Sequence, residues 1–333
     1  MIISRTPFRI SLFGGGSDYP TWYREHGGAV LGMAIDKYCH ISVRRLPPFF
    51  EHKHRIVYSR IELVNDFEQI QHPSARALLR EMKVDGGIEI HHDGDLPARS
   101  GLGSSSSFTV GLLNALYALK GRHVSKLELA REAIRIEQHV IRENVGSQDQ
   151  IWAAYGGLNR IEFNQDDTFN VVPLVLPLQR RLELQSSIMM VFTGLSRIAS
   201  EIAGAKIASL DKKKRHVKTM TAMVDEALSV LNAPNRPLNE IGELLHEAWM
   251  LKRELTDKVS NPTIDEIYQA GREAGAIGGK LLGAGGGGFM VFFVAPENRQ
   301  AVREKLSKLI HVSFKIDTGG SQIMLYEPDG LGT

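Results

Sequence analysis

The chain has 333 residues, a length that favours two domains around a shared cleft over one compact core. With 43% hydrophobic and 23% charged residues, its composition is typical of a soluble globular protein. A formal net charge of +2 excludes a field strong enough to indicate nucleic acid as a partner.

Cys39 is the single cysteine, which excludes a disulfide within the chain and a zinc site of clustered cysteines. The N-terminal sequence has no basic start followed by an apolar run, and no stretch reaches the roughly twenty apolar residues of a membrane span. We therefore expect a cytoplasmic protein that binds neither a membrane nor nucleic acid.

Residues 5–13 alternate between apolar and polar side chains, which predicts a strand that runs into Gly14-Gly15-Gly16-Ser17-Asp18. Successive glycines at a strand end indicate a backbone that bends and admits another group closely. The carboxylate of Asp18 is suited to sugar hydroxyls, and its alternative role is an Asx turn before Pro20. Asp36, at the end of a buried strand predicted over 29–35, is a second candidate for hydroxyl recognition.

The stretch 96–107 joins a predicted strand to a predicted helix that ends at Gly121. Gly101 and Gly103 allow a ligand to approach the backbone, and the free N–H groups of the first helical turn attract an anion. The serines that follow supply hydroxyls for a helix cap or for a phosphate-bound metal ion. The stretch is typical of a phosphate-binding loop, and the alternative is a tight connection with an ordinary serine cap.

A further helix is predicted after Ser125, because Ser125-Lys126-Leu127-Glu128 has the spacing of a capping box. Its apolar stripe directs Glu137 towards the interior. A buried carboxylate without a partner is costly, so Glu137 predicts a cation, a metal or a strong donor nearby. A partly exposed glutamate at the edge of the stripe fits the periodicity equally well.

A short helix is predicted to begin after Ser147, with Ser147 as its cap, Asp149 in its first turn and Gly156 at its end. An aspartate in such a position usually only compensates the helix dipole. The composition changes near Leu182, where we place the boundary between a first domain, 1–182, and a second domain, 183–333.

The second half is predicted to be α+β, with helices laid against an antiparallel sheet. Its glycine-rich stretch, 283–288, has the G-x-G-x-x-G spacing, but we expect it to follow a helix and to open a strand. The dinucleotide-binding fingerprint follows a strand and opens a helix. The G-x-x-x-x-G-K-[ST] order of a P-loop occurs nowhere in the chain, so a third kind of phosphate site is needed.

Three stretches together resemble the motifs of the GHMP superfamily of small-molecule kinases, which is named for galactokinase, homoserine kinase, mevalonate kinase and phosphomevalonate kinase. They are Arg9 to Tyr19, Pro97 to Ser105 with its Pro-x-x-x-Gly-Leu-Gly-Ser-Ser order, and Lys280 to Gly288. The resemblance spans the whole chain, and the middle motif is the most specific. It implies an α+β fold with an N-terminal ATP-binding domain that resembles the second domain of ribosomal protein S5 and a ferredoxin-like C-terminal domain.

The resemblance also implies roles for individual residues. Asp149 and Arg9 are expected to be catalytic, with Asp149 as the base for the attacked hydroxyl, and Ser105 and Glu137 are expected to hold Mg²⁺. The expected ATP contacts are Pro97, Ser100, Gly101, Leu102, Gly103, Ser104, Ser105, Ser106, Ser107, Gly285 and Gly286. The expected substrate contacts are Gly15, Gly16, Ser17, Asp18, Asp36 and Arg197.

Within the superfamily, the Gly-Gly-Gly-Ser-Asp loop, residues 34–37 and residues 192–197 are similar to bacterial D-glycero-D-manno-heptose 7-phosphate kinases. Galactokinases usually have Glu-His in place of Gly15-Gly16, which disfavours galactose. The resemblance implies that ATP phosphorylates the anomeric hydroxyl to give the 1,7-bisphosphate, on the path to nucleotide-activated heptose for surface polysaccharide. We expect Arg197 to hold the phosphate of the sugar, although an exposed helical arginine is the alternative.

Two other functions stay open. One is another anomeric sugar kinase, such as an L-fucokinase, and the other is a non-catalytic sugar-binding relative. The second is disfavoured because Ser105, Glu137 and Asp149 are all chemically competent. A homodimer is compatible with the sequence.

Overall fold

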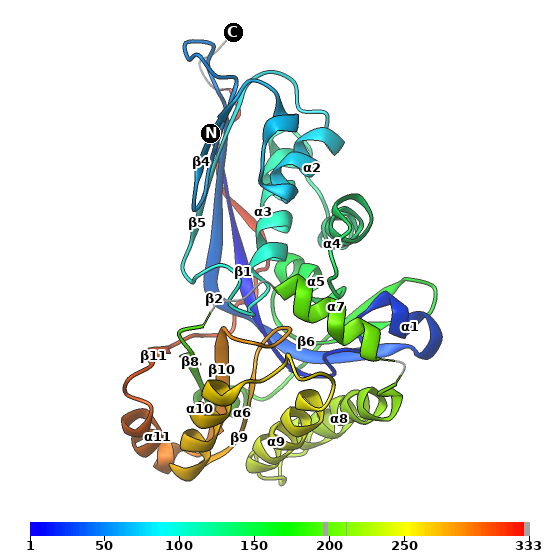
Figure 1. Cartoon of the computed structure of the whole chain (residues 1–333), viewed down its shortest axis with the longest axis vertical. Coiled ribbons are helices and arrows are strands. Elements are labelled where there is room, and N and C mark those ends of the chain that lie inside the picture. The colour runs from blue at the N-terminus through cyan, green and yellow to red at the C-terminus, as the bar shows by residue number, and fades with distance from the viewer. Residues whose placement is uncertain (196–198, 211, 330–333) are drawn as a thin grey trace.

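The computed structural model describes residues 1–195, 199–210 and 212–329, which form two sheets with helices packed against them (Figure 1). The first sheet has eight strands: β1 (Ile2–Phe13), β2 (Gly28–Arg45), β3 (His54–Val57), β4 (Ile61–Val64), β5 (Ile88–Gly94), β6 (Leu158–Phe163), β7 (Phe169–Pro173) and β12 (Gln322–Tyr326). The main path is β12-β1-β2-β5-β3-β4, and β6 and β7 continue from β2 outside that path. The pairing of β3 with β5 is parallel, and the other strand pairs of this sheet are antiparallel.

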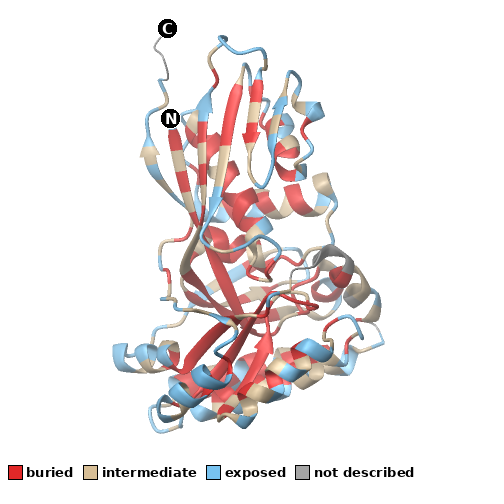
Figure 2. Cartoon of the chain, turned by 60° about the vertical axis from the view of Figure 1, so that its left-hand side comes forward, coloured by how far each residue is buried: buried red, intermediate tan, exposed pale blue. Residues whose placement is uncertain are grey.

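The long strand β2 holds this sheet together. Residues 28–33 pair with β6, and residues 39–45 pair with β5, while β1 runs alongside for most of the length. Between those two segments, the N–H of Ala34 donates to the carbonyl of Gly157, and the N–H of Asp36 donates to that of Lys315. Figure 2 shows buried residues along much of these strands.

Helices cover one face of the upper part of this sheet, where Figure 1 shows α2, α3 and α4 beside β1, β2 and β5. The helices of this half are α1 (Pro20–His26), α2 (Pro73–Glu81), α3 (Ser104–Leu119), α4 (Lys126–Arg135) and α5 (Gln148–Tyr155), with a 3₁₀ turn at Phe67–Gln69 and a π-helical turn at Ile136–Ile141. Most of α3 is buried, because its side chains are apolar nearly all round and it packs on β1 and β2.

The second sheet has four antiparallel strands in the order β11-β8-β10-β9. Its strands are β8 (Ile188–Phe192), β9 (Ala276–Leu281), β10 (Phe289–Val294) and β11 (Ile310–Val312). The accompanying helices are α6 (Leu178–Ser187), α7 (Ala199–Ser209), α8 (Lys214–Asn232), α9 (Asn239–Arg253), α10 (Pro262–Glu273) and α11 (Arg299–Lys305), with a 3₁₀ turn at Pro296–Asn298. The prediction of an α+β fold is confirmed, and no helix of the described ranges is long and apolar enough to cross a membrane.

The two ends of the chain pair with each other in the first sheet. This differs from the expected division into domains 1–182 and 183–333. The strand β12 pairs with β1, so a segment that we expected in the second domain belongs to the first sheet. Residue Leu182, the expected boundary, lies inside α6. The pairing of β12 joins residues more than 300 positions apart, and no local pattern reports such a contact.

Two local predictions are corrected in detail. The glycine stretch 283–288 follows β9, not a helix, and connects it to β10 as an antiparallel turn. Gly156 ends α5 as expected, but the Ser147 side chain does not cap the helix and instead pairs with the hydroxyl of Tyr23 and the amide of Gln138. By contrast, Ser125 caps α4 as predicted, since its hydroxyl accepts the N–H of Glu128.

Helix α9 packs closely on the second sheet at Gly278, and a substitution there tests this packing. A methyl group at this position would lie 1.9 Å from the carbonyl oxygen of Gly242 on α9, so the helix or the strand would have to move. Overpacking of this kind typically lowers the free energy of unfolding by roughly 1–3 kcal/mol. We therefore expect Gly278→Ala to lower the melting temperature by several degrees. Thermal unfolding measures this.

Gly204→Ala is the control for that measurement. Gly204 lies within α7, and among the described neighbours its added methyl would meet the end of the Asn144 side chain, at 3.2 Å. If both variants lost stability equally, the close packing of α9 on β9 would not be the cause of the loss.

Candidate functional site

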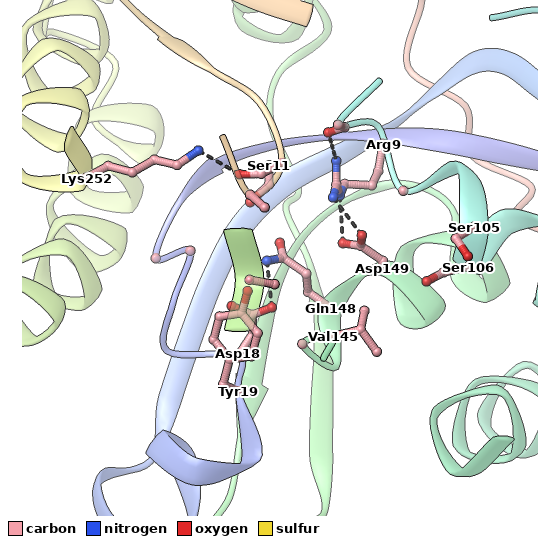
Figure 3. A pocket seen from close by; sticks show the side chains of 18 of the residues that line it. Arg9, Ser11, Asp18, Tyr19, Ser105, Ser106, Val145, Gln148, Asp149 and Lys252 are labelled. Atoms are coloured by element: carbon pink, nitrogen blue, oxygen red, sulfur yellow. Dashed lines mark hydrogen bonds and ion pairs between the residues drawn. The ribbon is translucent and has the colours of Figure 1, made fainter. Parts of the chain in front are cut away.

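A cavity opens where the two halves of the molecule meet (Figure 3). From the first half it is lined by the end of β1, the loop at residues 14–19, the start of α3 and residues 143–149. From the second half it is lined by residues of α7, α8 and α9, by Lys280 of β9 and by the turn after β9. The three glycine-bearing loops of the sequence therefore converge on one cavity.

Two of these loops touch through their backbones. A Cβ at Gly101 would lie 2.7 Å from the carbonyl oxygen of Leu282, and one at Gly283 would lie 2.5 Å from the Cα of Gly101. The N–H of Phe289 donates to the carbonyl of Ser100 at 3.0 Å. Gly101 and Gly283 both have positive φ, so both backbone shape and space require glycine here.

Arg9 and Asp149 form a bidentate ion pair at the wall of the cavity. Arg9 Nε donates to Asp149 Oδ1 at 2.8 Å, and Nη2 donates to Oδ2 at 2.7 Å. The remaining nitrogen, Nη1, donates to the carbonyl of Gly101 at 2.6 Å. A single guanidinium therefore fixes both the carboxylate and the glycine loop, in the planar geometry that arginine provides.

Asp149 lies directly beside the start of α3. A Cβ built on Gly103, the residue that precedes this helix, would lie 3.4 Å from the Asp149 carboxylate. The first main-chain bond of α3 runs from the N–H of Ser107 to the carbonyl of Gly103, so the N–H groups of Ser104 to Ser106 precede the helical ladder. Anion-attracting N–H groups and a carboxylate thus face the same space.

Glu137 is buried, with 1% of its surface exposed, on the π-helical turn that follows α4. The hydroxyl of Ser106 donates to Glu137 Oε2 at 2.8 Å, and the amide of Gln150 donates to the same oxygen. The other oxygen, Oε1, is buried and accepts no hydrogen bond from any residue that the structure describes. Burial raises the pKa of Glu137 to about 7, against the opposing effects of the nearby Thr109 hydroxyl and of these two donors.

The orphan oxygen of Glu137 fits an oxygen-binding cation. Hard divalent ions such as Mg²⁺ are held by carboxylate and hydroxyl oxygens, and a buried unpaired carboxylate oxygen otherwise costs free energy. The serine that contacts Glu137 is Ser106, whereas the expected metal ligand Ser105 is exposed on the adjacent position of the same turn.

The expected ATP contacts fall into two groups. Those that line the cavity are Gly101, Gly103, Ser104, Ser105 and Ser106. The others are outside the lining: Pro97 is exposed, Ser100, Leu102 and Ser107 are buried, and Gly285 and Gly286 lie in the turn beyond it.

Ser107 and Gly286 show why those residues are turned away from the cavity. The hydroxyl of Ser107 donates to the carbonyl of Pro7, and the N–H of Gly286 donates to that of Val259. In the third glycine loop it is Gly283 and Ala284 that reach the cavity.

The expected substrate contacts are also divided. Gly15 and Asp18 line the cavity, whereas Gly16 and Ser17 do not. The Asp18 carboxylate accepts the N–H of Gly16 and the side-chain amide of Gln148, each at 2.8 Å, so it ties the first loop to the start of α5.

Ser17 and Asp36 do not line the cavity. The Ser17 hydroxyl donates to main-chain carbonyls. The Asp36 carboxylate accepts the N–H of Lys315 at 2.7 Å, outside the cavity lining, because the segment after β11 packs on β2 at that point. Arg197 lies outside the described residues.

Sequence reasoning missed two buried lysines in the wall, Lys252 and Lys280. The apolar stripe of α9 includes Leu245, Ala248 and Trp249, and Lys252 occupies the next position of that stripe. This is the same signal that singled out Glu137, a charged residue on an otherwise buried helix face.

Two family models match the chain. The model of the GHMP kinases N terminal domain matches residues 70–157, and the model of the GHMP kinases C terminal domain matches residues 223–311. The chain is 30% identical to the D-glycero-alpha-D-manno-heptose 7-phosphate kinase of Campylobacter jejuni, over 92% of this chain and 93% of that one. The chain belongs to the GHMP kinases.

Solved structures have the same fold. A D-glycero-D-manno-heptose 1-phosphate kinase from Bacteroides thetaiotaomicron superposes with a TM-score of 0.75 at 23% identity, over 98% of this chain and 99% of that one. A Lactococcus lactis galactokinase complexed with galactose superposes with a TM-score of 0.73 at 20% identity, over 96% and 94%. This GHMP kinase is an ATP-dependent phosphotransferase that acts on an alcohol group, and it is a sugar kinase.

Proposed function

We propose that this GHMP kinase transfers the terminal phosphoryl group of ATP to the anomeric hydroxyl of D-glycero-D-manno-heptose 7-phosphate. The product is the 1,7-bisphosphate, which serves nucleotide-activated heptose and surface polysaccharide synthesis. The observation that carries the chemistry is the Arg9–Asp149 pair beside the start of α3. The heptose substrate is supported by the similarity to the Campylobacter jejuni kinase of that name.

In this proposal the start of α3 receives the phosphates of ATP. The N–H groups of Ser104 to Ser106 and the positive end of the helix dipole attract the phosphate oxygens. The contact of Gly101 with Gly283 brings the third glycine loop beside the same phosphates. Removing one preorganised donor of this kind from other enzymes costs roughly 3 kcal/mol of transition-state stabilisation.

Glu137 and Ser106 would hold the magnesium ion that accompanies ATP. When bound, that ion neutralises charge on the phosphate oxygens during transfer. The unpartnered Oε1 of Glu137 supports this assignment, and Ser106 already contacts the other oxygen. Ser105, exposed on the same turn, lines the cavity and in this proposal meets a phosphate of ATP.

Asp149 would orient the sugar hydroxyl and accept its proton. The hydroxyl oxygen forms a bond to the terminal phosphorus while the bond from that phosphorus to the bridging oxygen of ADP breaks, and the hydroxyl proton moves to the carboxylate. Because an anomeric hydroxyl is more acidic than an ordinary alcohol, a carboxylate is a sufficient base. Arg9 keeps the carboxylate in one orientation through its two hydrogen bonds.

Asp149→Asn tests the base. The amide keeps the size of the side chain and removes its basicity, so we expect kcat to fall by roughly a hundredfold or more. The affinity for MgATP should change much less. Steady-state kinetics, nucleotide-binding calorimetry and thermal unfolding on one preparation measure these effects.

Asp167→Asn is the matched control, since Asp167 pairs with Arg24 on the exposed surface at 2.7 Å. It should leave kcat near normal. If Asp149→Asn also kept a near-normal kcat while losing stability, Asp149 would be a structural partner of Arg9 and not the base.

Glu137→Gln tests the metal site. Replacing the carboxylate by an amide weakens a hard-cation ligand, so we expect a rise in the Mg²⁺ concentration that gives half-maximal activity. Glu128→Gln is the control, because Glu128 is a partly exposed glutamate paired with Arg122. A folded Glu137→Gln variant with unchanged Mg²⁺ dependence would show that Glu137 is structural.

A sugar panel tests the substrate. ADP release is measured with heptose 7-phosphate, the unphosphorylated heptose, L-fucose and galactose. We expect the highest kcat/KM with heptose 7-phosphate. If an unphosphorylated sugar gave an equal or higher kcat/KM, the proposed substrate would be wrong and the enzyme would be a kinase of unphosphorylated sugars.

A further inference from the structure

We infer that a second cavity, at the β11 edge of the second sheet, is a binding site for a small phosphate monoester. This edge cavity lies between the end of α6, the start of β8, the residues after β11 and helix α11. It shares no lining residue with the cavity between the two halves. The inference therefore goes beyond the proposed function and does not depend on the sugar substrate.

The edge cavity and the cavity between the halves lie at opposite edges of the second sheet. The strand order is β11-β8-β10-β9, and Lys280 of β9 lines the cavity between the halves. Adjacent strands are about 4.8 Å apart, so the two edge strands are about 14 Å apart. In Figure 1, α11 and β11 lie on the side of this sheet that faces away from α8 and α9.

The edge cavity forms where β11 is shorter than its neighbour β8. The last pair in the register of these two strands is Val312 with Met190, whereas β8 begins two residues earlier, at Ile188. On its other side, β8 remains paired with β10 as far as Ile188. Ser313 and Phe314 line the edge cavity together with the start of β8, so the cavity occupies the gap beyond the end of β11.

The wall of the edge cavity carries positive charge without a carboxylate to balance it. Of the described residues that line it, Arg299, Arg303 and His311 are basic and none is acidic. Glu304, the acidic residue of α11, accepts a hydrogen bond from the side-chain amide of Gln300. The cavity between the halves, by contrast, has carboxylates in its wall. The edge cavity therefore favours an anion.

The two arginines repel each other across one turn of α11. They occupy positions i and i+4, where Cβ atoms are about 6 Å apart and like charges destabilise a helix. Burial and the charge of Arg303 both lower the pKa of Arg299. Because a guanidinium stays protonated in proteins, the repulsion is not relieved by loss of a proton. A bound anion would relieve it.

Two side chains of the wall are held in place and keep donors for a ligand. Arg299 Nη1 donates to the carbonyl of Ser186, and the other nitrogens of Arg299 donate to no residue that the structure describes. Gln185 Oε1 accepts the N–H of Ile316 at 3.1 Å, which leaves the amide nitrogen of Gln185 as a donor. The planar fork of a guanidinium matches the oxygens of a phosphate group.

The size and the apolar part of the wall favour a small monoester. The volume of the edge cavity is about 140 Å³, which is the liquid volume of roughly five water molecules. Met189, Val312 and Phe314 contribute apolar side chains to the wall. A phosphate group with a short carbon chain uses both the charged and the apolar parts, whereas a nucleotide is too large to be enclosed.

Calorimetry with glycerol 3-phosphate tests the site, on enzyme whose nucleotide site is saturated with MgADP. We expect Arg299→Met and Arg303→Met each to weaken binding about tenfold, because each removes a charge-assisted contact. Arg303→Lys keeps the charge without the fork and should bind with intermediate affinity. Lys308→Met removes an exposed lysine outside the lining and should bind as the wild type does. Thermal unfolding reports whether each variant folds.

Chemical modification locates the binding. Phenylglyoxal reacts with accessible arginines, and peptide mass spectrometry gives the extent of reaction at each one. Glycerol 3-phosphate should protect Arg299 and Arg303 in the MgADP-saturated enzyme. Arg60, an exposed arginine that lines neither cavity, is the control and should react equally with and without the monoester.

The outcomes distinguish the ligand and the site. Tighter binding of glycerol 3-phosphate than of inorganic phosphate would support the monoester, whereas equal binding would overturn it in favour of inorganic phosphate. If folded Arg299→Met and Arg303→Met variants bound as the wild type does, or if Arg60 were protected as strongly, the edge cavity would not be the site. Failure of the sugar panel would leave this result unaffected, because the two cavities share no residue.

Discussion

The backbone contact between Gly101 and Gly283 is the constraint on which the cavity depends. These residues come from the two halves of the chain, and a methyl group on either would lie under 3.0 Å from backbone atoms of the other loop. The hydrogen bond from Phe289 to Ser100 and the bond from Arg9 to Gly101 hold the same junction. Because no side chain separates the loops, backbone from both halves can approach one ligand in the cavity.

Burial of the charged side chains around this junction costs free energy, and their polar contacts offset part of that cost. Arg9, Glu137, Lys252 and Lys280 are all buried, and a buried charge is tolerated only with close polar partners. Arg9 has three such contacts in the structure, whereas one oxygen of Glu137 has no partner in the part of the chain that the structure describes. Polar groups left unsatisfied in an otherwise packed interior are typical of sites that bind ligands, where stability is given up for function.

Local patterns predicted the parts of the site that depend on local chemistry. The glycines at 101 and 103, the inward-facing carboxylate of Glu137 and the Asp149 helix were all visible in the sequence, because glycine spacing and helical periodicity act over a few residues. The α+β class and the kinase family followed from the same motifs. Lys252 carries an equally local signal, because it is a charged residue on the buried stripe of α9.

The sequence by itself therefore determined the family, the glycine turn before α3 and the inward direction of Glu137, since these follow from motifs and short-range spacing. Only the tertiary structure decided which of two adjacent serines faces Glu137, that Asp36 packs on residue Lys315 away from the cavity, and that β12 completes the first sheet. Adjacent residues of a helix point about 100° apart, so only packing of α3 against the Glu137 turn distinguishes Ser106 from Ser105. Strand pairing between the two ends of a chain likewise depends on the closing of a long loop, which leaves no trace in the local sequence.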